Sequence, residues 1–227
     1  MASQKGPISH DSSTKATAVH PLISLLQRSA KFYNRLRSPS RKEVEVAFTK
    51  IVSALNNTPM RKRFWMCGGI LLGYAREGRL LNHDTDIDFH YWVEDEEILL
   101  EVLKDLCRHE FSYVGKMLDN SRRCTQHVIR RGKVKVDFFV AWRVDGKVRW
   151  TCYTTPHWNR PSRQYLNEIP DLQTAEVEFY GLPVSKPVDH ETYLQAVYGN
   201  WKEPMADYTY YVDSCSIIAC EPWRIKK

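Results

Sequence analysis

The amino-acid sequence predicts a domain of mixed helices and strands, of the α/β or α+β class. Apolar residues recur at helical spacing in some segments and alternate strictly with polar residues in others, and the two kinds of segment are interleaved along the chain. The sequence contains no internal repeat. Its hydrophobic fraction of 43% is ordinary for a globular protein that buries a sizeable core.

The predicted folded part begins near Ser40, which forms a capping box with Glu43 before a helix that ends at residues 56–59. Further elements follow in close succession. They are, in order, a short apolar strand (63–67), a helix (68–77), an alternating strand (84–92), an amphipathic helix (94–107), strands within 111–118 and 125–153 with a hairpin turn at residues 145–146, a helix (190–199), and a strand or docked segment (211–223).

The positive charge of the chain is concentrated at its start. Residues 1–42 contain eight Lys or Arg and one Asp, whereas the whole chain has a net charge of +6. The remainder is therefore nearly neutral, and we expect no nucleic-acid partner. We predict a basic, flexible tail at 1–38 and a catalytic domain at 39–227. Residues 21–37 have the pattern of a short amphipathic helix, which packs on the domain or contacts a membrane surface.

The sequence indicates a cytoplasmic protein. No run of eighteen apolar residues is present, and the first residues lack the pattern of a secretory signal. The six cysteines are scattered and form no Cys-x-x-Cys pair, so we expect reduced thiols.

Three carboxylates alternate in the segment "DTDIDFHYW", which is predicted to be a strand. Asp84, Asp86 and Asp88 then share one face, while Ile87 and Phe89 lie on the other. Neighbouring carboxylates repel one another unless a cation neutralises them. A hard divalent cation, Mg²⁺ or Mn²⁺, is suited to such oxygen ligands.

A fourth acid lies in a later apolar strand, "KVKVDFFV". Asp137 alternates there with core-forming residues such as Val136 and Phe138. It either faces the same site as the first acids or lies at a solvated edge, paired with Lys135 or Arg149. We favour the shared site.

Two glycines, Gly68 and Gly69, follow a strand and open a helix. Glycines at a helix N-terminus let the backbone approach a phosphate group. A Gly-Gly pair alone is more often a tight turn. Here it precedes an acidic strand and a distant further Asp, and this order is the layout of enzymes with the nucleotidyltransferase fold, which has a mixed central sheet flanked by helices.

The resemblance extends to one family. The segment "GGILLGYAREGRLLNHDTDIDF" resembles the signature of the LicD/fukutin phosphotransferases, and "FYGLPVSKPVDHETYLQAVYGNWKEP" resembles their closing segment. The departure lies at Asn82 and His83, where the family usually has Pro-Trp.

The resemblance implies a transferase that moves a phospho-alcohol group, such as phosphocholine or ribitol phosphate, from a CDP-activated donor to a hydroxyl of a glycan or glycolipid, releasing CMP. Asp86, Asp88 and Asp137 would bind the metal and carry catalysis, with Asp84 as an additional or outer ligand. The groups expected to hold the donor's phosphates are Gly68, Gly69 and Arg76.

Two alternatives remain open from the sequence. The chain could be a nucleotidyltransferase that adds a nucleotide to a small molecule, or an inactive relative that binds a nucleotide. The presence of all three candidate metal ligands favours an enzyme.

Overall fold

The computed structural model describes residues 38–154, 162–205 and 208–224. Residues Ser38–Lys227 form one compact unit, and the basic tail with its expected amphipathic helix lies outside the described residues, apart from Ser38. None of the helices in the described ranges is long and apolar enough to cross a membrane.

Four of the five described α-helices lie close to the predicted ones, whereas the short helix at Tyr210–Asp213 was not predicted and overlaps the segment expected to be a strand or docked segment. The capping box of Ser40 and Glu43 is present at the start of the first helix. The helices are α2 (Arg41–Asn56), α3 (Gly68–Glu77), α4 (Glu96–Leu106), α5 (His190–Tyr198) and α6 (Tyr210–Asp213), with a 3₁₀ turn at Val93–Asp95.

Ten strands are described, and three of them were not predicted. The unpredicted strands lie between residues 163 and 187, where the alternation of apolar and polar residues is weak. The strands are β1 (Phe64–Met66), β2 (Asp86–Trp92), β3 (Ser112–Leu118), β4 (Cys124–Arg131), β5 (Val134–Val144), β6 (Lys147–Thr154), β10 (Ile217–Pro222) and the unpredicted β7 (Arg163–Pro170), β8 (Thr174–Phe179) and β9 (Leu182–Pro187).

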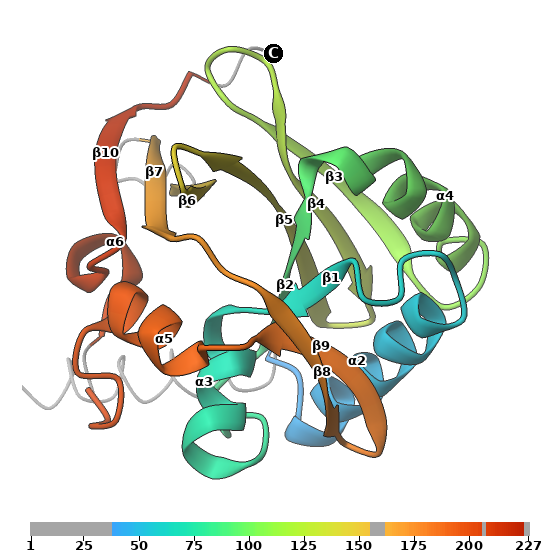
Figure 1. The fold of residues 1–227 in the computed structure, drawn as a ribbon. Coiled ribbons are helices and arrows are strands. Elements are labelled where there is room, and N and C mark those ends of the chain that lie inside the picture. Colours follow the sequence, from blue (N-terminus) through green and yellow to red (C-terminus); the bar gives the residue numbers. More distant parts are fainter. Residues whose placement is uncertain (1–37, 155–161, 206–207, 225–227) are drawn as a thin grey trace, which may run out of the picture. The chain divides into compact units, whose positions relative to one another are not determined.

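The main sheet is mixed and is flanked by helices, as predicted (Figure 1). Its order is β1-β2-β5-β6-β7-β10, with β4 also paired to β5 and β3 paired to β4. Only the β2–β5 pair among these described strands is parallel. The long strand β5 pairs with β2 and β4 over most of its length and with β6 at its end, so it joins the two parts of the sheet.

The apolar face of β2 forms the centre of the core. Ile87, Phe89 and Tyr91 are all fully buried. The ring of Phe89 stacks on Phe138 of β5 at 5.7 Å and on Phe48 of α2 at 6.2 Å, measured between ring centroids. The alternation in the sequence thus fixes the opposite face of β2 as the one that carries the acids.

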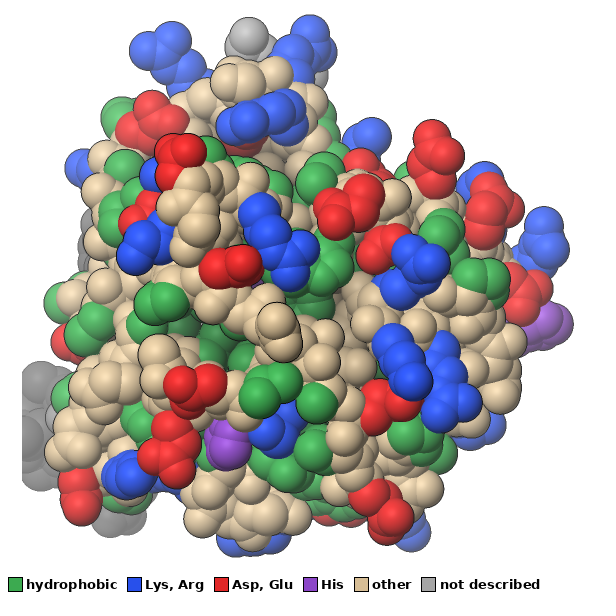
Figure 2. All heavy atoms as spheres, in the orientation of Figure 1, with side chains coloured by type: hydrophobic (Ala, Val, Ile, Leu, Met, Phe, Trp, Pro, Cys, Tyr) green, Lys and Arg blue, Asp and Glu red, His purple; other side chains and the backbone are tan. Residues whose placement is uncertain are grey.

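The surface of the described part carries interspersed charges. Figure 2 shows side chains of Lys or Arg next to those of Asp or Glu over the visible face, without a continuous region of one sign. This agrees with the nearly neutral charge of the chain after residue 42.

A hydrogen-bond network holds the loop before β2. The guanidinium of Arg41 donates to Glu45 at 2.8 Å, to Asn82 Oδ1 at 2.8 Å and to the Tyr180 hydroxyl at 2.7 Å. The same hydroxyl accepts from the backbone N–H of Leu80. Asn82, one of the two departures from the family pattern, thereby connects this loop to α2.

We expect Arg41→Met to lower the free energy of unfolding by about 1–2 kcal/mol, because three partners lose a donor at once. The control is Lys50→Met, which removes an ion pair with Glu110 that is about half exposed on both sides and should cost less than about 0.5 kcal/mol. Denaturant unfolding measures both values. Equal losses in the two variants would contradict the structural role of the network.

Candidate active site

Parallel pairing of β2 with β5 brings three of the predicted acids together. In the register of the two strands Asp88 lies opposite Asp137. One carboxylate oxygen from each of Asp86, Asp88 and Asp137 lies within 4.8 Å of the other two. Asp137 is not at a solvated edge, because β2 and β4 flank its strand and it is 1% exposed.

Lys135 completes this group, and the sequence analysis did not assign it to the site. Its Nζ lies 2.7 Å from Asp137 Oδ2 and 3.3 Å from Asp86 Oδ2. The signal in the sequence was its position two residues before Asp137, on the same strand face. The three carboxylates and one ammonium leave a net charge of −2 when all are ionised.

Burial makes this negative charge costly. Burial, followed by the charges of Asp86 and Asp137, raises the pKa of Asp88 well above its ordinary value. Burial also raises the pKa of Asp137, although Lys135 opposes the shift. Oδ1 of Asp137 is buried and has no hydrogen-bond partner among the described residues. Closely spaced hard oxygen donors with unbalanced negative charge fit a divalent cation.

The two glycines at the start of α3 adjoin the acids. A Cβ atom on Gly69 would lie 1.9 Å from Asp84 Oδ2, and one on Gly68 would lie 2.6 Å from Asp88 Oδ2. Gly68 also has a φ of +56°, which favours glycine. The glycines therefore let the carboxylates approach the helix backbone, and both line the same cavity as the acids.

Asp84 does not share a strand face with Asp86 and Asp88, contrary to the prediction. It lies in the loop before β2, because the strand begins only at Asp86. Its carboxylate instead lies against Gly69 at the start of α3 and belongs to the cavity lining.

Arg76 does not line the cavity that holds the acids, and its assignment to the donor's phosphates stays a prediction. It lies in the last turn of α3, about 12 Å along the helix axis from Gly68, and it is not among the cavity-lining residues. Lys135 is instead the cation next to the acids.

His90 also lines the cavity but is unsuited to proton transfer at neutral pH. It is 3% exposed and packs against Trp65 and Trp150. Burial lowers the pKa of His90 to about 3, so the ring remains neutral.

The cavity has a volume of about 370 Å³ and is lined by polar and by aromatic residues. The polar residues include the acids, Lys135 and the glycines. The aromatic group, named the aromatic side below, comes largely from the C-terminal part of the chain. Its members are Trp150, Tyr193, Tyr198, Tyr208, Tyr210 and Tyr211.

Residue Asn167 of β7 anchors part of this aromatic side. The Tyr210 hydroxyl and the Ser216 hydroxyl both donate to Asn167 Oδ1, at 2.8 Å and 2.9 Å. Asn167 itself is fully buried. The C-terminal segment, for which the sequence suggested no function, is thus fixed in place as a wall of the cavity.

Asp84 gives a testable dependence of stability on pH. Burial, followed by the charge of Asp86, raises its pKa from 3.8 to about 7. Because the folded state then holds a proton that the unfolded chain has released, the free energy of unfolding of the metal-free protein falls as pH rises through this interval. We expect the thermal midpoint in chelator to drop between about pH 4 and about pH 7, and to drop less in Asp84→Asn.

The matched control is Asp105→Asn, which changes an exposed acid and should leave the pH dependence of the parent unchanged. An unaltered slope in Asp84→Asn would contradict the raised pKa.

Comparison with known proteins gives two kinds of similarity. The solution structure of the antibiotic-resistance factor ANT(2'')-Ia is similar with 19% identity and a TM-score of 0.39, covering 63% of this chain and 64% of that one, which is less than two-thirds of its length. The crystal structure of ANT(2'')-Ia in complex with adenylyl-2''-tobramycin is similar with 18% identity and a TM-score of 0.40, covering 73% and 80%.

No curated protein matches the sequence. The family described as LicD/FKTN/FKRP, nucleotidyltransferase domain, matches residues 61–189, which are more than half of the chain. This range contains the glycines, the acids and Lys135. The chain therefore belongs to the LicD/FKTN/FKRP nucleotidyltransferase-domain family.

Proposed function

We propose that this protein is a metal-dependent phosphotransferase. It moves a phospho-alcohol group, such as phosphocholine or ribitol phosphate, from a CDP-activated donor to a hydroxyl of a glycan or glycolipid, and releases CMP. The observation that carries the proposal is the convergence of Asp86, Asp88 and Asp137 in one cavity within a chain of this family.

The three carboxylates would hold Mg²⁺ or Mn²⁺, which when bound neutralises charge on the donor's phosphates. The backbone at Gly68 and Gly69 adjoins the same space and can approach the diphosphate closely. The Lys135 ammonium adds a further positive charge beside it.

Asp137 would act as the general base and accept the proton of the acceptor hydroxyl. Its Oδ2 is held by Lys135, whereas its Oδ1 has no hydrogen-bond partner among the described residues. Burial raises the pKa of Asp137, and a carboxylate with a raised pKa is a better proton acceptor. The acceptor oxygen then attacks the phosphorus that carries the alcohol, the bond from that phosphorus to the bridging oxygen breaks, and CMP leaves with this oxygen.

The aromatic side of the cavity is assigned to the nucleoside or the sugar. The planar rings of Trp150 and Tyr211 belong to residues that line the same cavity as the acids. Cytosine and sugar rings stack on the faces of such rings.

The deciding experiment measures which product is released. The full chain is incubated with CDP-choline or CDP-ribitol, Mg²⁺ and a glycan acceptor, and in parallel with nucleoside triphosphates. Release of CMP together with a phosphorylated acceptor supports the proposal. Release of pyrophosphate with nucleotide attached to the acceptor would replace it with nucleotidyl transfer.

The acids should be needed for turnover but not for folding. We expect Asp88→Asn and Asp137→Asn each to lower turnover by about 100-fold or more. The exposed Asp105→Asn serves as the matched control. Circular dichroism verifies folding. Near-parental turnover in Asp88→Asn would remove the metal assignment, and in Asp137→Asn would remove both of that residue's roles.

Lys135 should affect metal binding and turnover in opposite directions. Its ammonium competes with a cation for Asp86 and Asp137. We expect Lys135→Met to bind Mn²⁺ about tenfold more tightly in the absence of donor and yet to turn over the donor more slowly. Calorimetry and the CMP assay measure the two effects, with Lys147→Met as the control. Weaker Mn²⁺ binding in Lys135→Met would contradict this role.

A further inference from the structure

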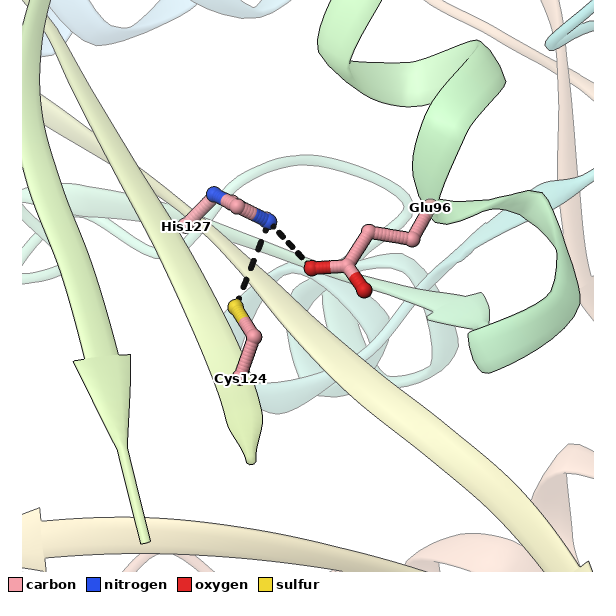
Figure 3. Close-up of side chains that lie close together, drawn as sticks. All are labelled: Glu96, Cys124 and His127. Atoms are coloured by element: carbon pink, nitrogen blue, oxygen red, sulfur yellow. Dashed lines mark hydrogen bonds and ion pairs between the residues drawn. The ribbon is translucent and has the colours of Figure 1, made fainter. Parts of the chain in front are cut away.

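A second cluster of potential metal ligands lies at the start of α4 and β4, away from the cavity. Figure 3 shows the side chains of Glu96, Cys124 and His127 pointing toward one another. His127 Nε2 lies 3.0 Å from Glu96 Oε1 and 3.3 Å from Cys124 Sγ. All three ligand atoms lie within 4.8 Å of one another.

A bulge in β4 creates this arrangement. Residues three apart on a regular strand point to opposite faces. The register with β3 shifts between Leu118, which pairs with Cys124, and Met117, which pairs with Gln126. The extra residue turns Cys124 to the face of His127. Glu96 reaches the same point from the first position of α4.

The cluster is separate from the acids of the candidate active site. Tyr91, whose ring lies 6.3 Å from that of His127, belongs to the face of β2 opposite Asp86 and Asp88. The sheet and its core residues therefore lie between the two groups.

The geometry differs from that of a nucleophilic relay. In a Cys-His-acid relay the nucleophile and the acid contact opposite ring nitrogens of the histidine. Here Cys124 and Glu96 both approach Nε2, and Nδ1 is 3.0 Å from the Tyr113 hydroxyl. The three ligand atoms thus surround one point, and the second ring nitrogen is held by an outer hydrogen bond, as is common for metal-binding histidines.

One neighbouring group lacks a partner. The Tyr91 hydroxyl is buried and has no hydrogen bond to any described residue. Burial, followed by the charges of Glu96, Cys124 and Tyr113, raises the pKa of this hydroxyl. This hydroxyl belongs to a ring whose centroid lies 6.3 Å from that of His127, and a buried polar group without a partner calls for an explanation such as a bound ion or water.

We propose that Glu96, Cys124 and His127 form a zinc site. Thiolate, imidazole and carboxylate are the ligands that zinc takes, and a tetrahedral ion would separate sulfur from nitrogen by about 3.6 Å and nitrogen from oxygen by about 3.4 Å. The present separations of 3.3 Å and 3.0 Å need to widen by only a few tenths of an ångström. One thiolate and one carboxylate balance the two charges of the ion.

Binding would release a proton. Burial, followed by the hydrogen bond and charge of Glu96, raises the pKa of Cys124 to about 12, so the thiol is protonated without metal. Burial lowers the pKa of His127 and keeps its ring neutral, as a ligand must be. The ion would join the start of α4 to β4 and stabilise the folded chain.

The test uses the full chain, reduced and stripped of metal, with Co²⁺ as a spectroscopic substitute for Zn²⁺. We expect one Co²⁺ to produce a thiolate-to-metal charge-transfer band that zinc abolishes, and zinc to raise the thermal midpoint. Cys124→Ser should lose the band and bind zinc at least about 100-fold more weakly. Tyr113→Phe, a change at a side chain that is 45% exposed, should weaken zinc binding by about 10–100-fold while preserving the fold.

Two controls locate the ion. Cys107→Ser changes a partly buried thiol outside the cluster and should keep the band. Asp88→Asn alters the carboxylate site and should keep zinc affinity. The proposal is overturned if the parent protein binds no zinc at micromolar concentration, if the band persists in Cys124→Ser, or if zinc binding is lost in Asp88→Asn alone. In the first case His127 is a buried histidine satisfied by Glu96 and Tyr113.

Discussion

Parallel pairing of β2 with β5 is the constraint on which the candidate site depends. It sets Asp88 beside Asp137 across two strands whose other faces form the core. A shift of one residue would turn one set of acids into the aromatic core, so the register and the core determine each other. The buried negative charge that results explains the position of Lys135 and the need for small residues at the start of α3.

The sheet separates two groups of ligands with different chemistry. One face offers carboxylate oxygens in a cavity next to a helix N-terminus, as suits a hard cation and a diphosphate. The other offers sulfur, nitrogen and oxygen at a helix start, a set suited to zinc. A chain with both sites would use one ion in its chemistry and the other to hold α4 on the sheet.

Elements distant in sequence supply the surroundings of the acids. Arg41 of α2 and Tyr180, after β8, fix the loop that precedes β2. Arg41 donates to Asn82 and to Tyr180, and the Tyr180 hydroxyl accepts from the backbone of Leu80. The C-terminal segment supplies tyrosines through its attachment to Asn167. At Asn82 this chain departs from the residue that is usual in the family, and the hydrogen-bond network gives this asparagine a structural role.

Local pattern determined most of the fold and the central acids. The helical spacing after Ser40 and the alternation around Asp86 and Asp88 specify their elements, because the period of apolar residues decides which face is buried. Residues whose roles depend on long-range pairing were not predictable. The ion pair of Lys135 with Asp86 depends on the register of β2 and β5. The distance of Arg76 from the acids depends on the direction of α3, and the cluster at His127 depends on a bulge in β4. Tertiary structure decided these positions because strand partners and bulges are set by packing between distant segments, which no local period in the sequence encodes.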